Sequence, residues 1–192
     1  MISFFIDTST NIGHVALLED SILIKHIKIV SNNNLSTNIF KYIETLFKES
    51  NIEVEQVKKI FVAVGPGSFT GVRIGVTIAK TFAWAKNIEI IPLSSLEIMA
   101  SSSNENAIIA NIDARRGFSF AGVYNKNLEN IMPDTYISLE ELKNKYIGQY
   151  ISDTENIDIE KIVKKHKFDE PVNPHKINPI YLKKTEAEEN HA

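Results

Sequence analysis

The sequence contains no cysteine among its 192 residues, a single tryptophan, and only eight glycines and six prolines. Without cysteine, disulfide bonds and thiolate metal sites are excluded, and nothing in the sequence points to an oxidising compartment. No segment approaches the ~20 consecutive apolar residues that a membrane helix needs. The N-terminal MISFFIDTST lacks a basic region, and Asp7 interrupts its short apolar run, which favours a strand over a signal peptide. We therefore expect a cytoplasmic protein without a membrane segment.

A large excess of either charge is also missing. The 21 Lys and Arg residues nearly balance 24 Asp and Glu residues, which gives a net charge of −3, and the lysines lie in small scattered groups. Proteins that bind nucleic acid by themselves usually concentrate basic side chains on one face. The hydrophobic content of 43% and charged content of 23% are ordinary for a globular domain. The isolated chain is therefore not expected to bind nucleic acid by itself.

Apolar patterning predicts the order βββαβαβ for the first part of the chain. Three strands are expected at residues 2–6, 14–19 and 22–30, because each run is β-branched or aromatic and short polar segments separate them. The elements expected next are a helix capped by Ser36 and ending near Ser50, a strand at 60–64, a helix over about 71–86, a strand at 88–93 and a short helix at 94–100.

The polar segment SSSNENA, residues 101–107, is the best candidate for a boundary between two lobes. Beyond it, ANIDARRGFSFAGVY weakly repeats the opening FFIDTSTNIGHVALL, with a strand that ends in Ile-Asp followed by a tight turn and a second strand. A strand near 131–137, a helix at 138–146, a strand near 148–152 and a helix near 157–166 are expected to follow. The predicted division is residues 1–103, residues 104–184 and a solvated tail at 185–192.

The most distinctive stretch is GPGSFTGVRIG, residues 65–75, which lies between a predicted strand and a predicted helix. It is no Walker loop, because Gly-Lys-Ser/Thr is missing at its end, and its GxGxxxG spacing does not fit a dinucleotide fingerprint. Two interpretations remain. The N–H groups of a helix N-terminus suit an anion. Alternatively, the small residues Gly71, Gly75, Ala79 and Ala83 let the helix pack closely, and its apolar arc of roughly 220° then needs two partners. The residues alone favour packing.

Four segments resemble one family: IDTST at 6–10, GPGSFTGVRIG at 65–75, IDAR at 112–115 and NPIYLKK at 178–184 are similar to TsaB, also called YeaZ. The resemblance implies an α/β fold of the actin-like ATPase superfamily, with two ribonuclease-H-like lobes of which the second is short. It further implies a noncatalytic dimerisation subunit of the bacterial machinery that makes threonylcarbamoyladenosine in tRNA. Where the family often has a histidine near its first helix, this chain has NNNLSTN, residues 32–38.

The resemblance also implies partners. The catalytic subunit TsaD would pair with the two long helices in a four-helix bundle, the ATPase TsaE would join them, tRNA would bind only through the complex, and the chain alone would form a homodimer. The expected interface residues are Phe40, Ile43, Phe47, Arg73, Gly75, Ala79, Lys80 and Trp84. No cofactor is firmly implied, and weak ATP or ADP binding within the complex stays open. The residues of such a vestigial nucleotide site would be Asp7, Thr8, Ser9, Gly65, Gly67, Ser68 and Asp113.

A rival hypothesis is an active enzyme, either an actin-like nucleotide hydrolase or phosphotransferase, or a metallo-hydrolase like TsaD. Asp7 and Asp113 end strands where active superfamily members hold metal and phosphates, but each could equally accept hydrogen bonds from its own turn. The five histidines form no HxxH or HxxxH pair, and no base lies near Ser68 or Thr70 in the sequence. The histidines are His14, His26, His166, His175 and His191. Arg115 and Arg116 could contact tRNA or an acidic partner, but two arginines in a turn are more often simply solvated, and we favour that interpretation.

Overall fold

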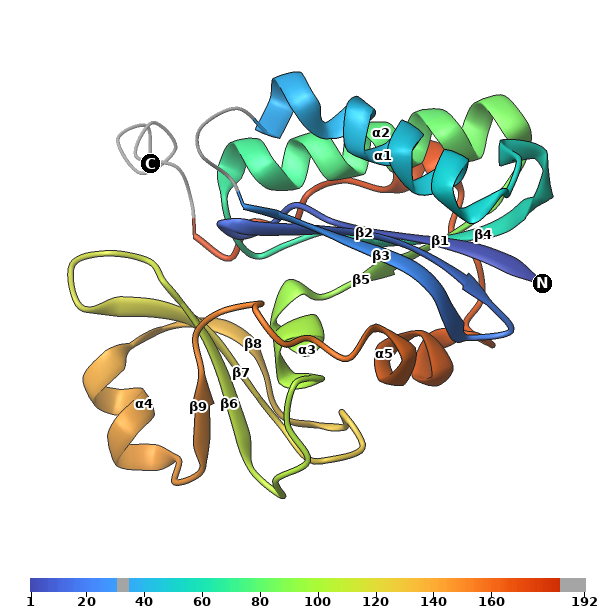
Figure 1. The fold of residues 1–192 in the computed structure, drawn as a ribbon. Helices are drawn as coiled ribbons and strands as arrows, with labels where there is room; N and C mark the ends of the chain where they lie inside the picture. Colours follow the sequence, from blue (N-terminus) through green and yellow to red (C-terminus); the bar gives the residue numbers. More distant parts are fainter. Residues whose placement is uncertain (31–34, 184–192) are drawn as a thin grey trace.

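The computed structural model describes residues 1–30 and 35–183, which form two lobes that are each built on one sheet (Figure 1). The first sheet has the strand order β3-β2-β1-β4-β5. Its first three strands are antiparallel neighbours, whereas β4 and β5 run parallel to β1. The elements of this lobe are β1 (Ile2–Asp7), β2 (Ile12–Glu19), β3 (Ile22–Val30), α1 (Leu35–Ser50), the 3-10 turn η1 (Val54–Gln56), β4 (Val57–Ala63), α2 (Phe69–Lys86), β5 (Glu89–Leu93) and α3 (Ser95–Ala100).

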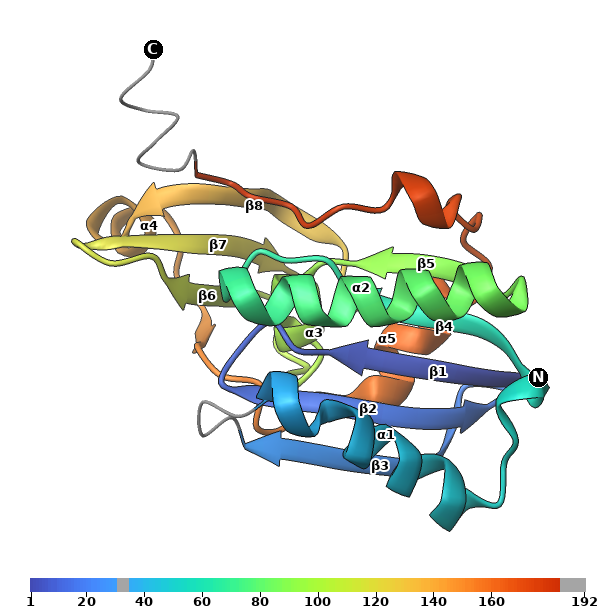
Figure 2. The ribbon, with the colours of Figure 1, turned by 90° about the horizontal axis from the view of Figure 1, so that it is seen from above.

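The central strands of the first sheet are buried on both faces. Phe4 and Ile6 point toward α1 and α2, whereas Phe5 lies in a second cluster with α3, α5 and strands of the other lobe. All three side chains have 0% exposure. A strand covered on both faces needs a continuous apolar run rather than an alternating one, which is why the sequence reads FFI at this point. Figure 2 shows α1 and α2 side by side over one face of this sheet.

The second sheet repeats the first with one strand fewer. Its order is β8-β7-β6-β9, with β6, β7 and β8 antiparallel and β9 parallel to β6. A helix follows its third strand, as α1 follows β3, so the weak sequence repeat corresponds to a real repeat of topology. The elements are β6 (Ile108–Asp113), β7 (Phe118–Tyr124), β8 (Asn130–Ser138), α4 (Leu139–Lys145), β9 (Gln149–Ile151), α5 (Ile159–His166) and the 3-10 turn η2 (Pro174–Lys176).

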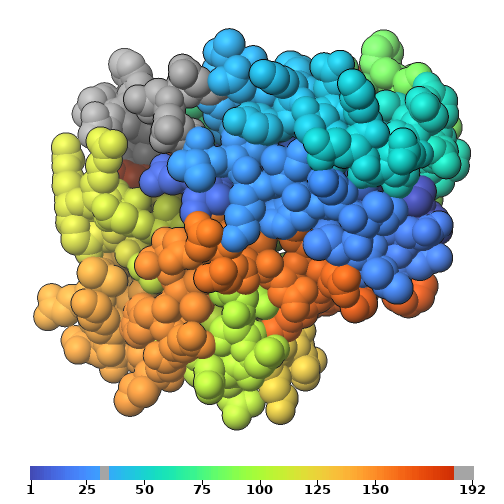
Figure 3. Space-filling model, viewed as in Figure 1, coloured from blue at the N-terminus to red at the C-terminus, as the bar shows by residue number. Residues whose placement is uncertain are grey.

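The chain passes back to the first lobe after β9. Glu155 forms an ion pair with Lys28 at 3.0 Å, and Glu160 accepts a hydrogen bond from the Leu23 backbone N–H at 2.9 Å. In the space-filling view, the orange segment that follows β9 lies directly against the blue segment of the first lobe (Figure 3). The α5 helix therefore packs beside α3 on the face of the first sheet opposite α1 and α2.

Residues 171–183, here called the C-terminal strap, run beside β5 and α2 (Figure 2). The Val172 N–H donates to the Ile90 carbonyl at 3.0 Å, and the Ile180 N–H donates to the Val64 carbonyl at 2.7 Å. Ile177 is buried in the first lobe's core. The division of the chain near residue 104 stays a prediction, but the strap, which that division assigned to the second lobe, contacts the first sheet.

The elements expected from the sequence are present, and the differences are local. Ser36 was expected to cap the first helix, but α1 already begins at Leu35, so Ser36 lies inside it. The second helix begins at Phe69 rather than 71, because Ser68 caps it by accepting a hydrogen bond from the Gly71 N–H at 3.2 Å. Residues 31–34 and the expected tail at 185–192 lie outside the described residues. No helix among the described residues is long and apolar enough to cross a membrane.

Candidate functional site

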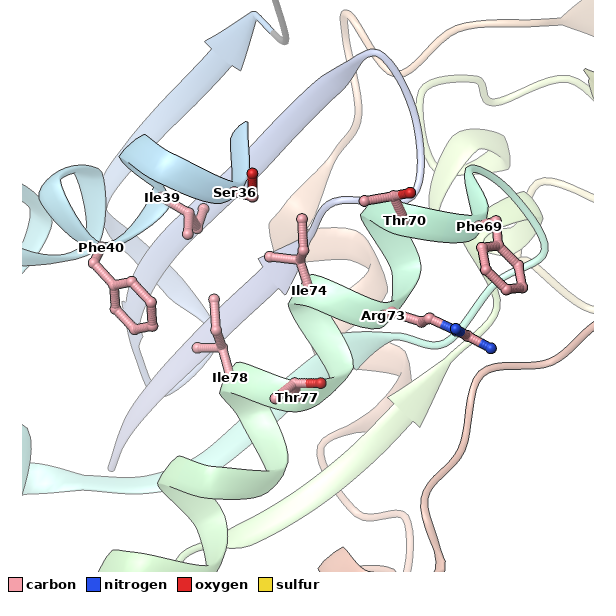
Figure 4. Close-up of a pocket in the computed structure, with 9 residues that line it drawn as sticks. All are labelled: Ser36, Ile39, Phe40, Phe69, Thr70, Arg73, Ile74, Thr77 and Ile78. Carbon is pink, nitrogen blue, oxygen red and sulfur yellow. The ribbon is translucent and has the colours of Figure 1, made fainter. Parts of the chain in front are cut away.

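An open groove of about 440 Å³ separates α1 from α2 on the outer surface of the first lobe (Figure 4). Its walls are mostly apolar, and Phe40 at its edge is 65% exposed. The residues that line it are Ser36, Ile39 and Phe40 from α1, and Phe69, Thr70, Arg73, Ile74, Thr77 and Ile78 from α2. A second hollow of about 540 Å³ continues along α1 from Phe40 past Phe47 and Phe82. The two helices therefore present a continuous apolar surface, of the kind that marks interaction sites.

The small residues of α2 do not face this groove. A Cβ atom on Gly71 would lie 2.0 Å from the Thr8 carbonyl oxygen, and one on Gly75 would lie 2.5 Å from Thr8 Oγ1. The Thr8 hydroxyl also donates to the Gly71 carbonyl at 2.7 Å. The stripe thus lets α2 pack on the end of β1, as the packing interpretation predicted. Gly75 and Ala79, both expected at the partner interface, are buried against the chain's own first sheet, and their contact with a partner stays a prediction.

The other expected interface residues lie in three places: at the groove, in the core beneath α1, and beside the strap. Ile43 and Phe47 are more than 90% buried in the core beneath α1, whereas Phe40 stays exposed. On α2, Lys80 Nζ donates to the Ile177 carbonyl at 2.7 Å. Trp84 is 68% exposed, with its ring 6.3 Å from that of His175. Part of the surface of α2 is therefore covered by the chain's own strap. Contact of Phe40, Ile43, Phe47, Lys80 and Trp84 with a partner stays a prediction.

Sequence reasoning left some groove residues out of the interface. Phe69 and Thr77 line the groove beside Arg73 but were not among the expected contacts. Phe69 belongs to the glycine-rich stretch, where its aromatic ring at the start of an amphipathic helix was the available signal. Thr77 gave no signal of its own, because a polar residue on that arc is ordinary for a solvated helix face.

A separate cleft of about 790 Å³ lies between the lobes. It brings together Ser9, Gly67, Ser68 and Asp113, four of the seven residues expected in a vestigial nucleotide site. Asp7, Thr8 and Gly65, the other three, are buried and are not among the residues that line it. Residues not expected there are Thr10, Asn11, Ile12, Phe69, Thr70, Ile112, Arg115, Phe120, Ser152, Asp153 and Thr154. The sequence could not identify the last three, because only the fold brings the segment after β9 to the ends of β1 and β6.

Both aspartates that end a first strand accept hydrogen bonds from their own turns. Asp7 Oδ1 accepts the Ser9 N–H at 2.8 Å, and Asp113 Oδ1 accepts the Arg115 N–H at 2.9 Å. This confirms the turn interpretation of the two residues. Burial raises the pKa of the Asp7 carboxyl, and the hydrogen bonding with Ser9 only partly opposes it. A carboxyl group with a raised pKa is a poor ligand for a cation.

The glycine-rich loop uses its N–H groups within the chain. The Ser68 N–H donates to the Ser9 carbonyl at 2.7 Å, and a Cβ atom on Gly67 would lie 2.3 Å from that same oxygen. Gly65 has φ +105°, and a Cβ atom there would meet the Ile180 carbonyl oxygen at 2.8 Å. The loop therefore holds the β1–β2 turn on one side and the strap on the other. These contacts require glycine without any phosphate.

Two of the histidines contact each other in the described part of the chain. His14 and His26 lie on neighbouring strands with Nδ1 and Nε2 at 2.9 Å, a pairing that their spacing in the sequence did not reveal. Burial lowers the pKa of His14 to about 3, and His26 and Lys28 add to the effect. Within residues 1–30 and 35–183, no three His, Asp or Glu side chains are grouped so that they could hold a metal ion. His191 lies outside these residues.

Comparison with known proteins places these features in a family. The family model described as TsaD, tRNA N6-adenosine threonylcarbamoyltransferase, matches residues 28–187. The tRNA threonylcarbamoyladenosine biosynthesis protein TsaB of Bacillus subtilis is 40% identical over 142 residues, which cover 71% of this chain and 62% of that protein. The TsaB protein of Escherichia coli is 29% identical over 130 residues, 66% of this chain and 56% of that protein. The chain belongs to the TsaB (YeaZ) family.

Solved structures of this family share the fold. YeaZ from Pseudomonas aeruginosa superposes with a TM-score of 0.78 at 21% identity, covering 94% of this chain and 99% of that one. An uncharacterized protein with similarity to peptidase YeaZ, also from P. aeruginosa, has a TM-score of 0.81 at 20% identity, covering 95% and 99%. The fold is the actin-like one predicted from the sequence. The alignments with the two TsaB relatives span little more than half the length of each relative.

Proposed function

We propose that this chain is a noncatalytic scaffold subunit of the machinery that makes threonylcarbamoyladenosine in tRNA, and that it pairs with the catalytic subunit TsaD through α1 and α2. The observation that carries the proposal is the apolar groove between these helices in a member of the TsaB family. An exposed apolar surface of this size, rimmed by polar residues, fits a protein partner better than solvent.

The relationship to the transferase supports the choice of partner. The family model that matches most of this chain is that of the transferase itself. Two chains of one fold can pair through equivalent surfaces about a pseudo-twofold axis, so that α1 and α2 meet their counterparts in a four-helix bundle. On this proposal the chain alone forms a homodimer through the same helices, a TsaE-like ATPase joins the complex, and tRNA binds only to the complex.

The geometry of the interlobe cleft supports a noncatalytic role. The loop N–H groups of Ser68 and Gly71 already have partners within the chain, and Asp7 does not line the cleft and has a pKa raised by burial. No lysine lines this cleft among the described residues. We expect weak nucleotide binding at most, without turnover. Tight magnesium-dependent ATP binding by the purified chain, lost in Gly67→Ala, would instead support the rival enzyme.

Calorimetric titration against the catalytic subunit of the same organism tests the pairing. Phe40→Asp places a charge on the apolar surface where the two hollows meet, so we expect binding to weaken by at least ~30-fold. Ile147→Asp is the matched control, because Ile147 is 93% exposed on the second lobe, away from the groove. It should bind like the wild-type chain. Failure of the wild-type chain to bind, or equal loss in both variants, would contradict the proposal.

A further inference from the structure

Two of the distinctive sequence segments meet at one end of the groove. Phe69 and Arg73 come from the stretch GPGSFTGVRIG, and Tyr181 comes from NPIYLKK in the strap. The two aromatic rings lie 5.4 Å apart between centroids, and the guanidinium carbon of Arg73 lies 3.8 Å from the centre of the Phe69 ring. Arg73 Nε donates a hydrogen bond to the Tyr181 hydroxyl at 2.8 Å. Residues more than 100 positions apart thus form one cluster.

This cluster orients the guanidinium group. The guanidinium carbon lies over the ring of Phe69, and the Tyr181 hydroxyl accepts the hydrogen bond of the Nε–H group. Among the described residues, no hydrogen-bond or ion-pair partner is present for the two Nη groups of Arg73. A guanidinium that is already oriented loses less freedom when it binds a carboxylate, and its two parallel N–H groups match the two carboxylate oxygens.

The groove itself indicates what kind of molecule carries this carboxylate. Arg73 alone is charged among the nine described residues that line it, and the remaining surface is dominated by Ile39, Phe40, Ile74 and Ile78. A nucleic acid would need several cations along its backbone. An amphipathic helix would place an apolar stripe against these side chains and one acidic residue at the end of the stripe. Charge complementarity therefore favours a protein helix.

We infer that Arg73, oriented by Phe69 and Tyr181, binds an Asp or Glu carboxylate on the helix of the catalytic subunit that packs in the groove. The inference rests on the proposed function and adds the chemistry that recognises the partner. Tyr181 is a positioning residue in this scheme. Its place is fixed by the preceding residue, because the Ile180 N–H is bound to the Val64 carbonyl at 2.7 Å.

The test measures the Kd for the catalytic subunit of the same organism at several salt concentrations. Arg73→Gln should weaken binding by about 10- to 30-fold and make the salt dependence shallower, because it removes a charge-assisted pair. Tyr181→Phe keeps the ring but removes the hydroxyl, and it should weaken binding by about 3-fold. Its unfolding midpoint should stay unchanged. Lys41→Gln, which removes one exposed cation of α1 outside the groove, is the charge-matched control and should bind normally.

The carboxylate is then located by replacing each Asp and Glu on the equivalent helices of the catalytic subunit with Ala. One of these replacements should weaken binding to the wild-type chain but cost little further affinity when it is combined with Arg73→Gln, as a double-mutant cycle requires. The inference is overturned if Arg73→Gln binds with wild-type affinity and salt dependence while Phe40→Asp does not bind. It is also overturned if Arg73→Gln abolishes only self-association, since the groove then takes a second copy. If the wild-type chain does not bind, the proposed function fails as well.

Discussion

The two lobes begin alike and then diverge. Each opens with a strand that ends in Ile-Asp, and in each the aspartate accepts a hydrogen bond from the backbone N–H two residues later. Asp7 is nevertheless fully buried, whereas Asp113 is exposed at the interlobe cleft. The same local turn has therefore been placed in two different environments.

The two lobes also differ in the lengths of their helices. The first lobe carries α1 with 16 residues and α2 with 18, whereas α4, the helix that follows the third strand of the second sheet, has only seven. Long helices cover a large core and still leave an outer face free, which becomes the groove. The short α4 covers only a small cluster around Ile109, Val123 and Leu142. A repeated topology therefore gives a binding surface only where the helices are long enough to supply one.

The largest expected effect breaks the close packing that is special to the first lobe. Gly71→Val would place side-chain atoms where the Thr8 carbonyl oxygen already lies. We therefore expect a loss of about 3 to 5 kcal/mol in the free energy of unfolding. Gly117→Ala is the counterpart in the turn of the second lobe, where φ is +79° but nothing lies within 4 Å. It should cost only about 1 to 2 kcal/mol. Urea denaturation measures both, and equal losses would contradict the packing role of Gly71.

A smaller effect sharpens the contrast between the two aspartates. The pKa of Asp7 is raised in the folded chain, so its stabilising effect is present below the unfolded pKa and is lost as pH rises through the folded pKa. Relative to Asp7→Asn, the wild-type chain should therefore lose about 1 to 3 kcal/mol of unfolding free energy between pH 4 and 8. Asp113→Asn should follow the wild-type profile. Parallel profiles for the wild type and Asp7→Asn would refute the effect of burial.

The smallest effect concerns the contact of α5 with α3. His166 Nε2 lies 3.0 Å from Glu97 Oε1, and Nδ1 lies 2.6 Å from Asp169 Oδ2. Burial opposes the charged imidazole, but the two carboxylates outweigh it and raise the pKa of His166 above 6.5. The contribution of His166 to the free energy of unfolding is therefore complete below pH 6.5 and is lost as pH rises through the pKa of His166 in the folded chain. His166→Gln should cost about 1 kcal/mol near pH 6 and little near pH 9.

Thermal unfolding at several pH values measures this contribution. The pKa of Glu97 is lowered by His166 and Lys165 despite its burial, so its contribution holds above pH 4.5 and is lost only as pH falls through the lowered pKa. The difference between wild type and His166→Gln should consequently be largest in mildly acidic solution. A difference that does not change with pH would mean that His166 acts through packing alone.

Much of the fold was predictable because local patterns carry it. The strand runs, the helix at 71–86 and the repeated Ile-Asp hairpin are all visible as periodicity or as composition, and the structure has each of them. The small residues Gly71 and Gly75 predicted close packing correctly. The sequence did not reveal which neighbour they pack on, since the approach of Thr8 depends on how β1 lies beside β4.

The candidate site was predictable only in part for the same reason. Arg73 and the motif around it stood out in the sequence, and Phe40 stood out on the amphipathic first helix. The cluster with Tyr181 could not be foreseen, because it requires the strap to return along β5 and α2 after the whole second lobe. The burial of Ile43 and Phe47, expected at an interface, likewise depends on the depth at which α1 rests on the sheet.

The sequence by itself determined the family and the order of the elements, and it indicated that the helix after the glycine-rich loop packs closely. These depend on interactions between residues that are neighbours along the chain or on patterns within one segment. Only the tertiary structure decided which faces of α1 and α2 stay free and where the strap lies. It also decided that Arg73 is held by Phe69 and Tyr181. Such contacts join distant segments, and their energy depends on the packing of the whole fold rather than on any one stretch of sequence.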